Sequence, residues 1–217
     1  MPYFLGIETS FHNTALALLG EETEISLSDS YPATRHQESL FPLLSYLFQS
    51  FHLAVKDLSG IGVTIGPGMF TSLRVGLAAA KSLALPHQIP VKGITTFLGL
   101  TETYYEIFPE EEGRLIPVID AKKNQVYAQV YQKKEATSEP ELISPEEIVK
   151  KYPDAIFFGS GIKSAPEVFQ KVRRANILFP SPVVIARRAR EAILKGEADA
   201  LPELVPFYLK EPEIRRK

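Results

Sequence analysis

Cysteine is absent from this sequence of 217 residues, and with it three kinds of site. Without a thiol the chain has no disulfide framework, no thiolate zinc site and no cysteine nucleophile. No uninterrupted apolar run approaches the roughly 20 residues that a membrane-spanning helix requires. The stretch from Met1 to Phe4 carries no basic residue and leads into no long apolar segment before Glu8, unlike a secretory signal. We therefore expect a cytoplasmic protein without a membrane contact.

Neither sign of charge is in excess, because 24 Lys and Arg stand against 26 Asp and Glu, a net charge of −2. No global basic field is available to recruit nucleic acid, although local basic clusters remain. Arg187, Arg188 and Arg190 form one such cluster, typical either of a tRNA contact or of a solvated helix face. Hydrophobic residues make up 45% of the chain, which excludes an intrinsically disordered protein and predicts a packed core.

Short apolar runs alternate with helical patterns along the chain, which predicts an α/β layered fold. The predicted strands cover residues 3–9, 13–19, 23–31, 59–65, 90–94, 115–120, 124–131 and 155–158. The predicted helices cover residues 34–52, 71–84, 95–108, 145–151, 166–174 and 183–195. Pro42 is expected to bend the first helix or to mark its first turn. A polar stretch at 109–113 predicts a boundary between two lobes, 1–108 and 109–217, and the final segment of the second is a candidate to return to the first.

Two units of strand, acid, turn and strand lie 112 positions apart, measured from Glu8 to Asp120. The strand after Glu8 runs from residue 13 to 19, and the strand after Asp120 from residue 124 to 131. Any two amphipathic hairpins would align about as well. The residues alone therefore leave an internal duplication open.

The segment from Thr64 to Gly76 carries the most specific pattern, a strand followed by Gly-Pro-Gly and then a helix. Glycines let a backbone turn sharply and approach a ligand closely, and the start of a helix presents free amide groups. The segment lacks the Gly-Lys-Ser/Thr ending of a P-loop and the spacing of a dinucleotide fingerprint. Its residues thus allow both an anion or nucleotide contact and a tight turn with a purely structural role.

Two helices carry more apolar surface than one core face requires. In the first, the apolar residues are Leu40, Phe41, Leu43, Leu44, Leu47, Phe48 and Phe51. In the second they are Phe70, Leu73, Leu77 and Ala80. A helix that is apolar over a wide arc must be covered on more than its own core side. The residues leave open a deeply buried helix pair and a partner interface.

No catalytic constellation stands out. The histidines are His12, His36, His52 and His87, and no two of them are four positions apart, the spacing that would bind a metal from one helix face. We interpret His36 as a capping or surface residue. The sequence predicts neither a metal site nor a catalytic residue.

Taken together, the motifs resemble the bacterial TsaB (YeaZ) family. Residues 66–76 are similar to the family's Gly-Pro-Gly-Ser-Phe-Thr-Gly-Leu-Arg-x-Gly, and the likeness covers nearly the whole chain. Further similar segments are Glu8-Thr9-Ser10, Arg35-His36, Gly93-Ile94-Thr95-Thr96, Ile119 to Lys122 with Val126-Tyr127, and Pro206 to Lys210. This chain has Glu8, Met69, Ser72 and Lys210 where the family has Asp, Ser, Gly and Arg. These departures weaken the expectation of a phosphate contact at those positions.

The resemblance implies the actin/sugar-kinase/Hsp70-like (ASKHA) fold, with two related lobes that each contain a mixed sheet. It also implies a non-catalytic scaffold that binds and activates the threonylcarbamoyltransferase TsaD, together with the ATPase TsaE. The assembled complex would then make threonylcarbamoyladenosine at a tRNA adenosine next to the anticodon. TsaD carries His-x-x-x-His where this chain has Thr96 to Leu100. The alternative is a self-sufficient small-molecule kinase on the same fold.

The resemblance further implies that ATP and metal are used by the complex, that this chain has no cofactor of its own, and that tRNA is reached through the complex. The two apolar helices are expected to bind TsaD, and to form a homodimer when the chain is alone. The expected interface residues are Leu40, Leu43, Leu44, Leu47, Phe70, Leu73, Arg74, Leu77 and Lys81. The residues expected at a vestigial phosphate or nucleotide contact are Glu8, Ser10, Gly66, Gly68, Thr71 and Asp120.

Overall fold

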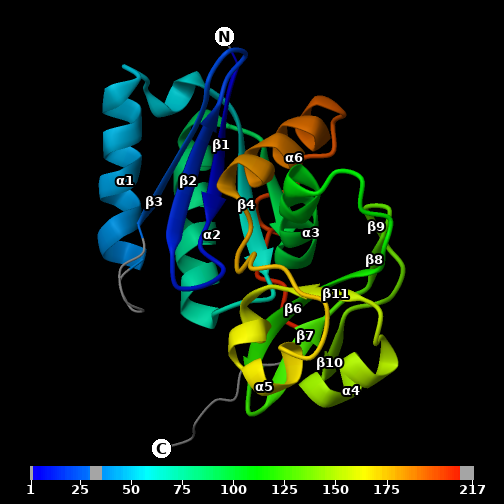
Figure 1. Cartoon of the computed structure of the whole chain (residues 1–217). Helices are drawn as coiled ribbons and strands as arrows, with labels where there is room; N and C mark the ends of the chain where they lie inside the picture. Colours follow the sequence, from blue (N-terminus) through cyan, green and yellow to red (C-terminus); the bar gives the residue numbers. More distant parts are fainter. Residues whose placement is uncertain (1, 30–35, 211–217) are drawn as a thin grey trace, which may run out of the picture.

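A computed structural model describes residues 2–29 and 36–210 and contains two sheets with helices packed on them (Figure 1). The strands are β1 (Tyr3–Glu8), β2 (Thr14–Leu19), β3 (Glu24–Asp29), β4 (Leu58–Gly66), β5 (Val91–Thr95), β6 (Leu115–Lys122), β7 (Gln125–Ala128), β8 (Tyr131–Gln132), β9 (Glu135–Ala136), β10 (Glu141–Ile143) and β11 (Ile156–Phe158). The α-helices are α1 (His36–Ser50), α2 (Phe70–Ala84), α3 (Thr96–Ile107), α4 (Pro145–Lys151), α5 (Pro166–Phe169) and α6 (Pro182–Leu194). Short 3-10 helices are η1 (Val55–Asp57), η2 (Leu85–His87) and η3 (Ser160–Lys163). The predicted α/β class is confirmed.

The first lobe is built on a mixed sheet with the strand order β3-β2-β1-β4-β5. β1 pairs antiparallel with β2 and parallel with β4, as expected for a hairpin followed by crossover connections. Alternate side chains of β1 point to opposite faces, so Leu5 and Ile7 pack into the core shared with α1 and α2. Gly6 points the other way, where an added Cβ would lie 2.1 Å from the carbonyl oxygen of Pro182 on α6. Figure 1 shows α2 behind this sheet and α6 in front of it.

The second lobe repeats this strand order. β6 pairs antiparallel with β7 and parallel with β11, and β10 lies beyond β7. Residues 173–177 form a further extended edge on β11, where the amide of Ala175 donates to the carbonyl of Phe157 at 2.9 Å. The path β10-β7-β6-β11-(173–177) therefore matches β3-β2-β1-β4-β5. In the first lobe α1, α2 and α3 follow β3, β4 and β5, and in the second α4, α5 and α6 follow β10, β11 and residues 173–177. This shared order supports the internal duplication that the residues had left open.

Several predicted elements differ from the structure. The strand predicted over 124–131 ends at Ala128, and Tyr131 begins β8, which pairs with β6 at Leu115. The helix predicted over 166–174 ends at Phe169, because residues 173–177 are extended along β11 instead. α1 continues through Pro42, so this proline does not mark the first turn. Residues 30–31 of the predicted strand 23–31 and residues 34–35 of the predicted helix 34–52 lie outside the described residues. The side chain of His36 also lies outside them.

The last part of the chain returns to the first lobe. α6 packs on β1, β2, β4 and β5, although it follows the second sheet in sequence. The amide of Asp199 then donates to the carbonyl of Val91 on β5 at 2.8 Å, and its carboxylate accepts from the Lys92 amine at 2.8 Å and from the Gly93 amide at 2.7 Å. Further on, the amide of Phe207 donates to the carbonyl of Ile65 at 2.7 Å. Residues 182–207 thus tie the end of the chain to the first sheet.

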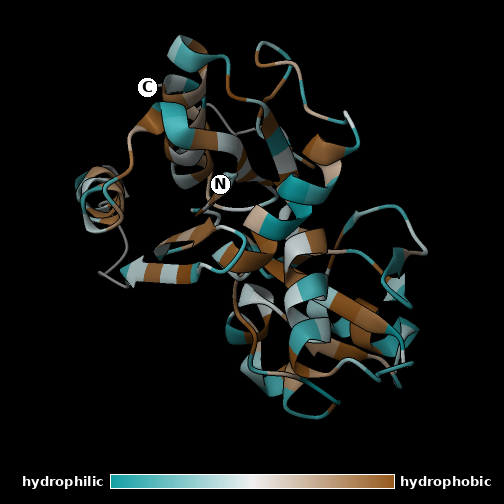
Figure 2. Ribbon diagram, turned by 90° about the horizontal axis from the view of Figure 1, so that it is seen from above, coloured by the Kyte–Doolittle hydropathy of each residue, from teal (hydrophilic) through white to brown (hydrophobic). Residues whose placement is uncertain are grey.

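The two sheets have separate hydrophobic cores. The first core joins β1, β2 and β4 to α1 and α2, and the second joins β6, β7 and β11 to α3, α4 and α5. α1 stands at the outer side of the molecule and is seen almost end-on in Figure 2. Within the described residues, no helix combines the length and apolar character needed to cross a membrane.

Candidate functional site

The acid at the end of β1, Glu8, is fully buried. The amide and the hydroxyl of Ser10 both donate to its Oε1 atom, at 2.7 and 2.5 Å. Burial raises the pKa of the Glu8 carboxyl to about 7, and the hydrogen bonds from Ser10 partly offset this effect. Glu8 therefore holds the turn of the first hairpin in place, away from solvent.

The Gly-Pro-Gly turn packs directly on that hairpin. The amide of Met69 donates to the carbonyl of Ser10 at 2.9 Å. A Cβ at Gly68 would lie 2.3 Å from the same carbonyl oxygen, and a Cβ at Gly76 would lie 2.2 Å from Oγ1 of Thr9. Gly66 has a φ of 115°, which side-chain-bearing residues rarely adopt. Each of these glycines is therefore explained by close packing or backbone conformation.

The acid at the equivalent place in the second lobe, Asp120, is bound by its own neighbour. Its Oδ1 accepts from the amide of Lys122 at 2.9 Å, and its Oδ2 forms an ion pair with the Lys122 amine at 2.5 Å. The amide of Asp120 donates to the Ser160 hydroxyl at 3.2 Å. Lys122 thus engages both carboxylate oxygens, one through its backbone amide and the other through its side-chain amine.

A cavity of about 280 Å³ lies between the two lobes. It is lined by Phe11, Gly68, Met69, Phe70, Thr71, Ile119, Asp120, Ala121, Lys122 and Tyr127. Of the six residues predicted for a vestigial phosphate contact, Gly68, Thr71 and Asp120 meet here, whereas Glu8, Ser10 and Gly66 do not line the cavity. The fold class implies a nucleotide and its metal at this place. The lining does not fit them, because its one carboxylate is neutralised by Lys122 and most of the other side chains are apolar.

The predicted interface residues fall into two sets. Five of them are buried in the core of the first lobe, with exposed fractions between 0% and 4%: Leu40, Leu44, Leu47, Leu73 and Leu77. The expectation that these five lie on an exposed stripe is wrong, because they form the helix faces that pack on the first sheet. Leu43 and Lys81 are half-buried, whereas Phe70 and Arg74 are exposed.

A groove of about 470 Å³ lies on the outer side of α1 and α2. Its lining consists of Phe41, Phe70, Thr71, Arg74, Val75, Ala78, Ala79 and Ser82. The side chain of Phe41 is 54% exposed and that of Phe70 is 38% exposed, and Tyr46 on α1 is 61% exposed. Phe41 and Ala78 line the groove but were missed as site residues. The spacing of four between Phe70, Arg74 and Ala78 is the signal that could have identified this second stripe.

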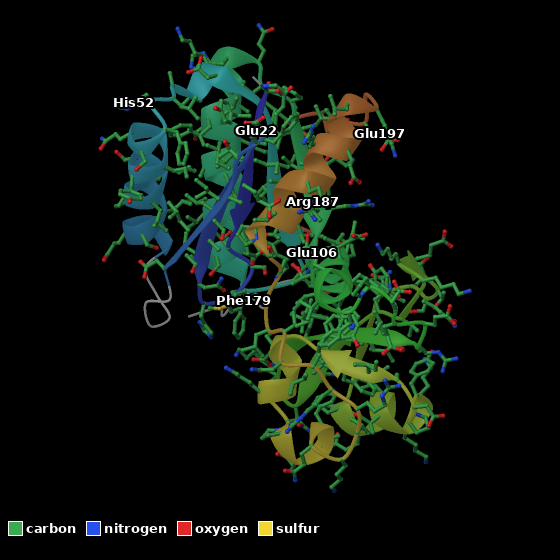
Figure 3. All side chains as sticks on the ribbon, turned by 45° about the horizontal axis from the view of Figure 1, so that its top comes forward. Glu22, His52, Glu106, Phe179, Arg187 and Glu197 are labelled. Atoms are coloured by element: carbon green, nitrogen blue, oxygen red, sulfur yellow. The ribbon has the colours of Figure 1, made fainter. Side chains whose placement is uncertain are left out.

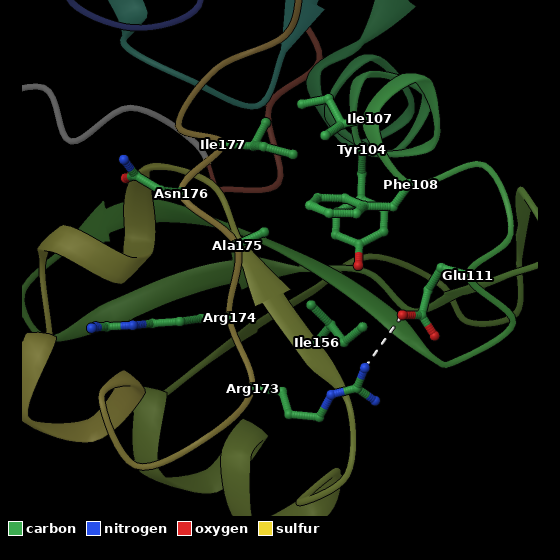
Figure 4. A pocket seen from close by; sticks show the side chains of 10 residues that line it. All are labelled: Tyr104, Ile107, Phe108, Glu111, Ile156, Arg173, Arg174, Ala175, Asn176 and Ile177. Atoms are coloured by element: carbon green, nitrogen blue, oxygen red, sulfur yellow. Dashed lines mark hydrogen bonds and ion pairs between the residues drawn. The ribbon is translucent and has the colours of Figure 1, made fainter.

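A second cavity, of about 530 Å³, lies where α3 ends against residues 173–177 (Figure 4). Its walls include the ring of Tyr104 and an ion pair of 3.3 Å between Arg173 and Glu111. Burial, and then the nearby Glu111 carboxylate, raise the pKa of Tyr104. No predicted site residue lines this cavity, and the sequence holds no motif there that could have identified it.

The basic cluster on α6 is largely used within the chain. Arg187 forms ion pairs with Glu24, at 3.0 Å, and with Glu106, which lies beside it in Figure 3. Arg188 pairs with Glu191 at 2.8 Å. These contacts favour the interpretation of this cluster as a charged helix face.

Two sheets that share a strand path, each with an acid near the end of its first strand and a helix-covered face, define the actin/sugar-kinase/Hsp70-like class. A solved structure of YeaZ from Pseudomonas aeruginosa has the same fold, with a TM-score of 0.81 and 24% identity. The match covers 96% of this chain and 100% of that one.

Sequence comparison narrows this class to one family. The family model described as TsaD, tRNA N6-adenosine threonylcarbamoyltransferase, matches residues 30–201. The tRNA threonylcarbamoyladenosine biosynthesis protein TsaB of Bacillus subtilis (strain 168) is 33% identical over 225 residues, which cover 98% of this chain and 96% of that protein. The tRNA N6-adenosine threonylcarbamoyltransferase of Tropheryma whipplei (strain Twist) is 34% identical over 114 residues, or 46% of this chain and 28% of that enzyme. The chain belongs to the TsaB (YeaZ) family.

Proposed function

We propose that this chain is a non-catalytic subunit in the synthesis of threonylcarbamoyladenosine in tRNA. It docks on a TsaD-like threonylcarbamoyltransferase through the exposed face of α1 and α2. The observation that carries this proposal is the groove on that face, where Phe41 and Phe70 are exposed together. Apolar side chains gathered in this way on a surface commonly mark a protein–protein contact.

The site between the lobes supports a role without catalysis. An active member of this fold class uses the acids of its two hairpins to manage phosphate and metal. Here Glu8 is buried beneath Ser10, and Asp120 is paired with Lys122. We therefore assign ATP and metal to the assembled complex, in which a TsaE-like ATPase joins the transferase, and we expect tRNA to be bound through that complex.

We expect the same face to mediate self-association when the transferase is absent. The transferase of Tropheryma whipplei is similar to this chain over 114 residues, at 34% identity, so a related surface is expected on both proteins. A second copy of the chain is then a substitute partner, in an arrangement where each protomer contributes the same patch. We expect a homodimer that the transferase disrupts.

A charge placed in the groove tests the docking face. Ala78 is exposed on α2 and lines the groove, so Ala78→Glu leaves the core intact and forces a desolvated charge on docking. We expect the variant to keep the wild-type circular dichroism spectrum but to lose copurification with the transferase of the same genome and the modification of tRNA. The matched control is Ala198→Glu, an exposed alanine beyond α6, which should retain both.

Two outcomes contradict the proposal in different ways. Wild-type affinity of Ala78→Glu for the transferase would place the docking face elsewhere on the chain. A wild-type chain that neither binds the transferase nor increases tRNA modification in the reconstituted reaction would overturn the role itself.

A further inference from the structure

The C-terminal segment contributes a side chain to the rim of the groove. The ring of Tyr208 stacks on the ring of Phe70, with centroids 5.3 Å apart and an interplanar angle of 25°. The guanidinium of Arg74 lies over the same Phe70 ring, 3.8 Å from its centroid. Nε of Arg74 also donates to the hydroxyl of Tyr208 at 3.2 Å. Three side chains from two distant parts of the chain thus form one stacked unit.

This unit fixes an exposed arginine. A free arginine side chain has many rotamers, and ordering it on binding costs conformational entropy. Arg74 has a π contact and a hydrogen bond that restrict it before any partner arrives. Because Nε is used by Tyr208, the two terminal nitrogens are left to meet a ligand, in the planar geometry that matches a carboxylate.

Among the residues that the structure describes, the groove around Arg74 has no countercharge. Arg74 is the one charged side chain of these residues that lines it. None of their carboxylates forms an ion pair with Arg74, whereas Arg173, Arg187 and Arg188 each have at least one such partner. A fixed cation in an apolar surface favours the binding of one anionic group. The ion pair that results is stronger when its surroundings exclude water.

The shape of the groove favours a helix as the occupant. Phe70, Arg74, Ala78 and Ser82 follow each other at intervals of four along α2. Such a row is a ridge of the kind that packs against the side chains of a neighbouring helix. Small residues at 78, 79 and 82 leave room for that helix to approach.

We propose that Arg74 receives a carboxylate from an otherwise apolar helix of the transferase, and that Tyr208 is the positioning residue that holds the guanidinium for it. This proposal rests on the proposed function and specifies the chemistry of its docking face. A wholly apolar helix and an RNA phosphate are the competing ligands, and the experiment separates them.

The experiment measures the affinity of the purified chain for the transferase, without RNA, at several salt concentrations. Arg74→Gln keeps a polar side chain of similar width and removes the charge. We expect it to weaken binding by about tenfold or more and to flatten the salt dependence, since the ion pair is the part of the contact that salt screens. Arg190→Gln on α6 removes a charge away from the groove and should leave the affinity and its salt dependence unchanged.

The role of Tyr208 is tested through its coupling to Arg74. Tyr208→Phe keeps the ring and removes the hydroxyl that accepts from Nε, so we expect a loss of about threefold with an unchanged melting temperature. Combined with Arg74→Gln, the same change should cause no further loss, because its effect passes through the arginine. Losses that multiply fully in the double variant would show that Tyr208 acts independently of Arg74.

The remaining outcomes are equally distinct. If Arg74→Gln binds as tightly as the wild type with the same salt dependence, the occupant is an apolar helix and the proposal is wrong. In a second assay with tRNA present, the retention of tRNA by the complex is measured. If Arg74→Gln leaves the transferase affinity unchanged but the complex retains less tRNA, the ligand is an RNA phosphate and the proposal is again wrong. A wild-type chain that fails to bind the transferase overturns the proposed function, whereas silent Arg74 variants beside a binding wild type overturn this inference alone.

Discussion

The two lobes share a strand order but have kept different helices. α1 and α2 have 15 residues each, whereas their counterparts in the second lobe, α4 and α5, have 7 and 4. The long pair covers the first sheet on one side and presents an exposed apolar groove on the other. The short pair does little more than close the second core, into which Phe169 inserts fully buried. The long helices therefore belong to the lobe where we propose that the partner docks.

The acids of the two hairpins, Glu8 and Asp120, also differ in their burial and in their partners. Glu8 is buried and bound by Ser10, whereas the side chain of Asp120 is 13% exposed and paired with the 71% exposed side chain of Lys122. The first acid organises the interior of its lobe. The second lines the cavity between the lobes, where its neighbour neutralises it. Equivalent positions in the two lobes therefore have different physical roles. Four substitutions test this contrast between the lobes.

The largest effect is expected in the buried face of α2. Leu77 is 4% exposed and packs in the first core, so Leu77→Glu places a charge among apolar side chains. The cost of about 4 kcal/mol or more is comparable to the whole stability of a small domain, and we expect the variant to be unfolded by circular dichroism. Ala78→Glu, one position along on the exposed face, should stay folded. A folded Leu77→Glu chain would show that α2 does not support the core.

The next effect depends on pH. Because burial raises the pKa of Glu8 to about 7 from 4.5, the folded chain holds this proton more tightly than the unfolded chain. The stability that this difference contributes is fully present below pH 4.5 and is lost as the pH rises through 7. Glu8→Gln removes the titration, so its stability relative to the wild type should increase between these values by about 3 kcal/mol. Urea unfolding at several pH values measures it, and a difference that stays flat from pH 4.5 to 7 would contradict a buried, weakly acidic Glu8.

A smaller effect is expected where the chain returns to the first lobe. Asp199→Ala removes the acceptor for the Lys92 amine and for the Gly93 amide. Because both contacts are partly exposed, we expect a loss of about 1–2 kcal/mol in thermal unfolding. Glu197→Ala is the matched control, because the exposed side chain of Glu197 forms no hydrogen bond or ion pair within the described residues. An equal effect of the two variants would show that the segment is not anchored through Asp199.

The smallest effect is expected at the acid of the second lobe. Asp120→Asn removes an ion pair whose lysine is largely exposed, and exposed pairs contribute about 0–1 kcal/mol. Thermal unfolding measures the loss, which should be well below that of Leu77→Glu. A loss of several kcal/mol would make the two hairpin acids equally important for stability and remove the contrast between the lobes.

Much of the fold could be predicted from sequence because the strands are apolar runs bounded by turn residues. Thr14–Leu19 and Leu115–Lys122 are of this kind. The edge at 173–177 could not, because a partly charged segment becomes extended only by pairing with β11. The candidate functional site was harder to predict from the sequence than the fold. Leucines at helical spacing identify α1 and α2 as amphipathic, but burial against the sheet decides which stripe is inside, so Leu44 and Leu77 were placed on the wrong face. Lys122, which neutralises Asp120, gives no signal beyond its proximity in sequence.

The return of α6 to the first sheet also sets an order of events during synthesis. The strands that α6 covers, from β1 to β5, emerge from the ribosome before it, so one face of this sheet has no cover until residue 194 has been made. Phe4 and Leu19 pack with Ala186 of α6 in the finished molecule. Contacts of such long sequence separation form slowly, because a long loop must close before they can stabilise anything. The lobe that begins the chain therefore cannot complete its packing until α6 has been made.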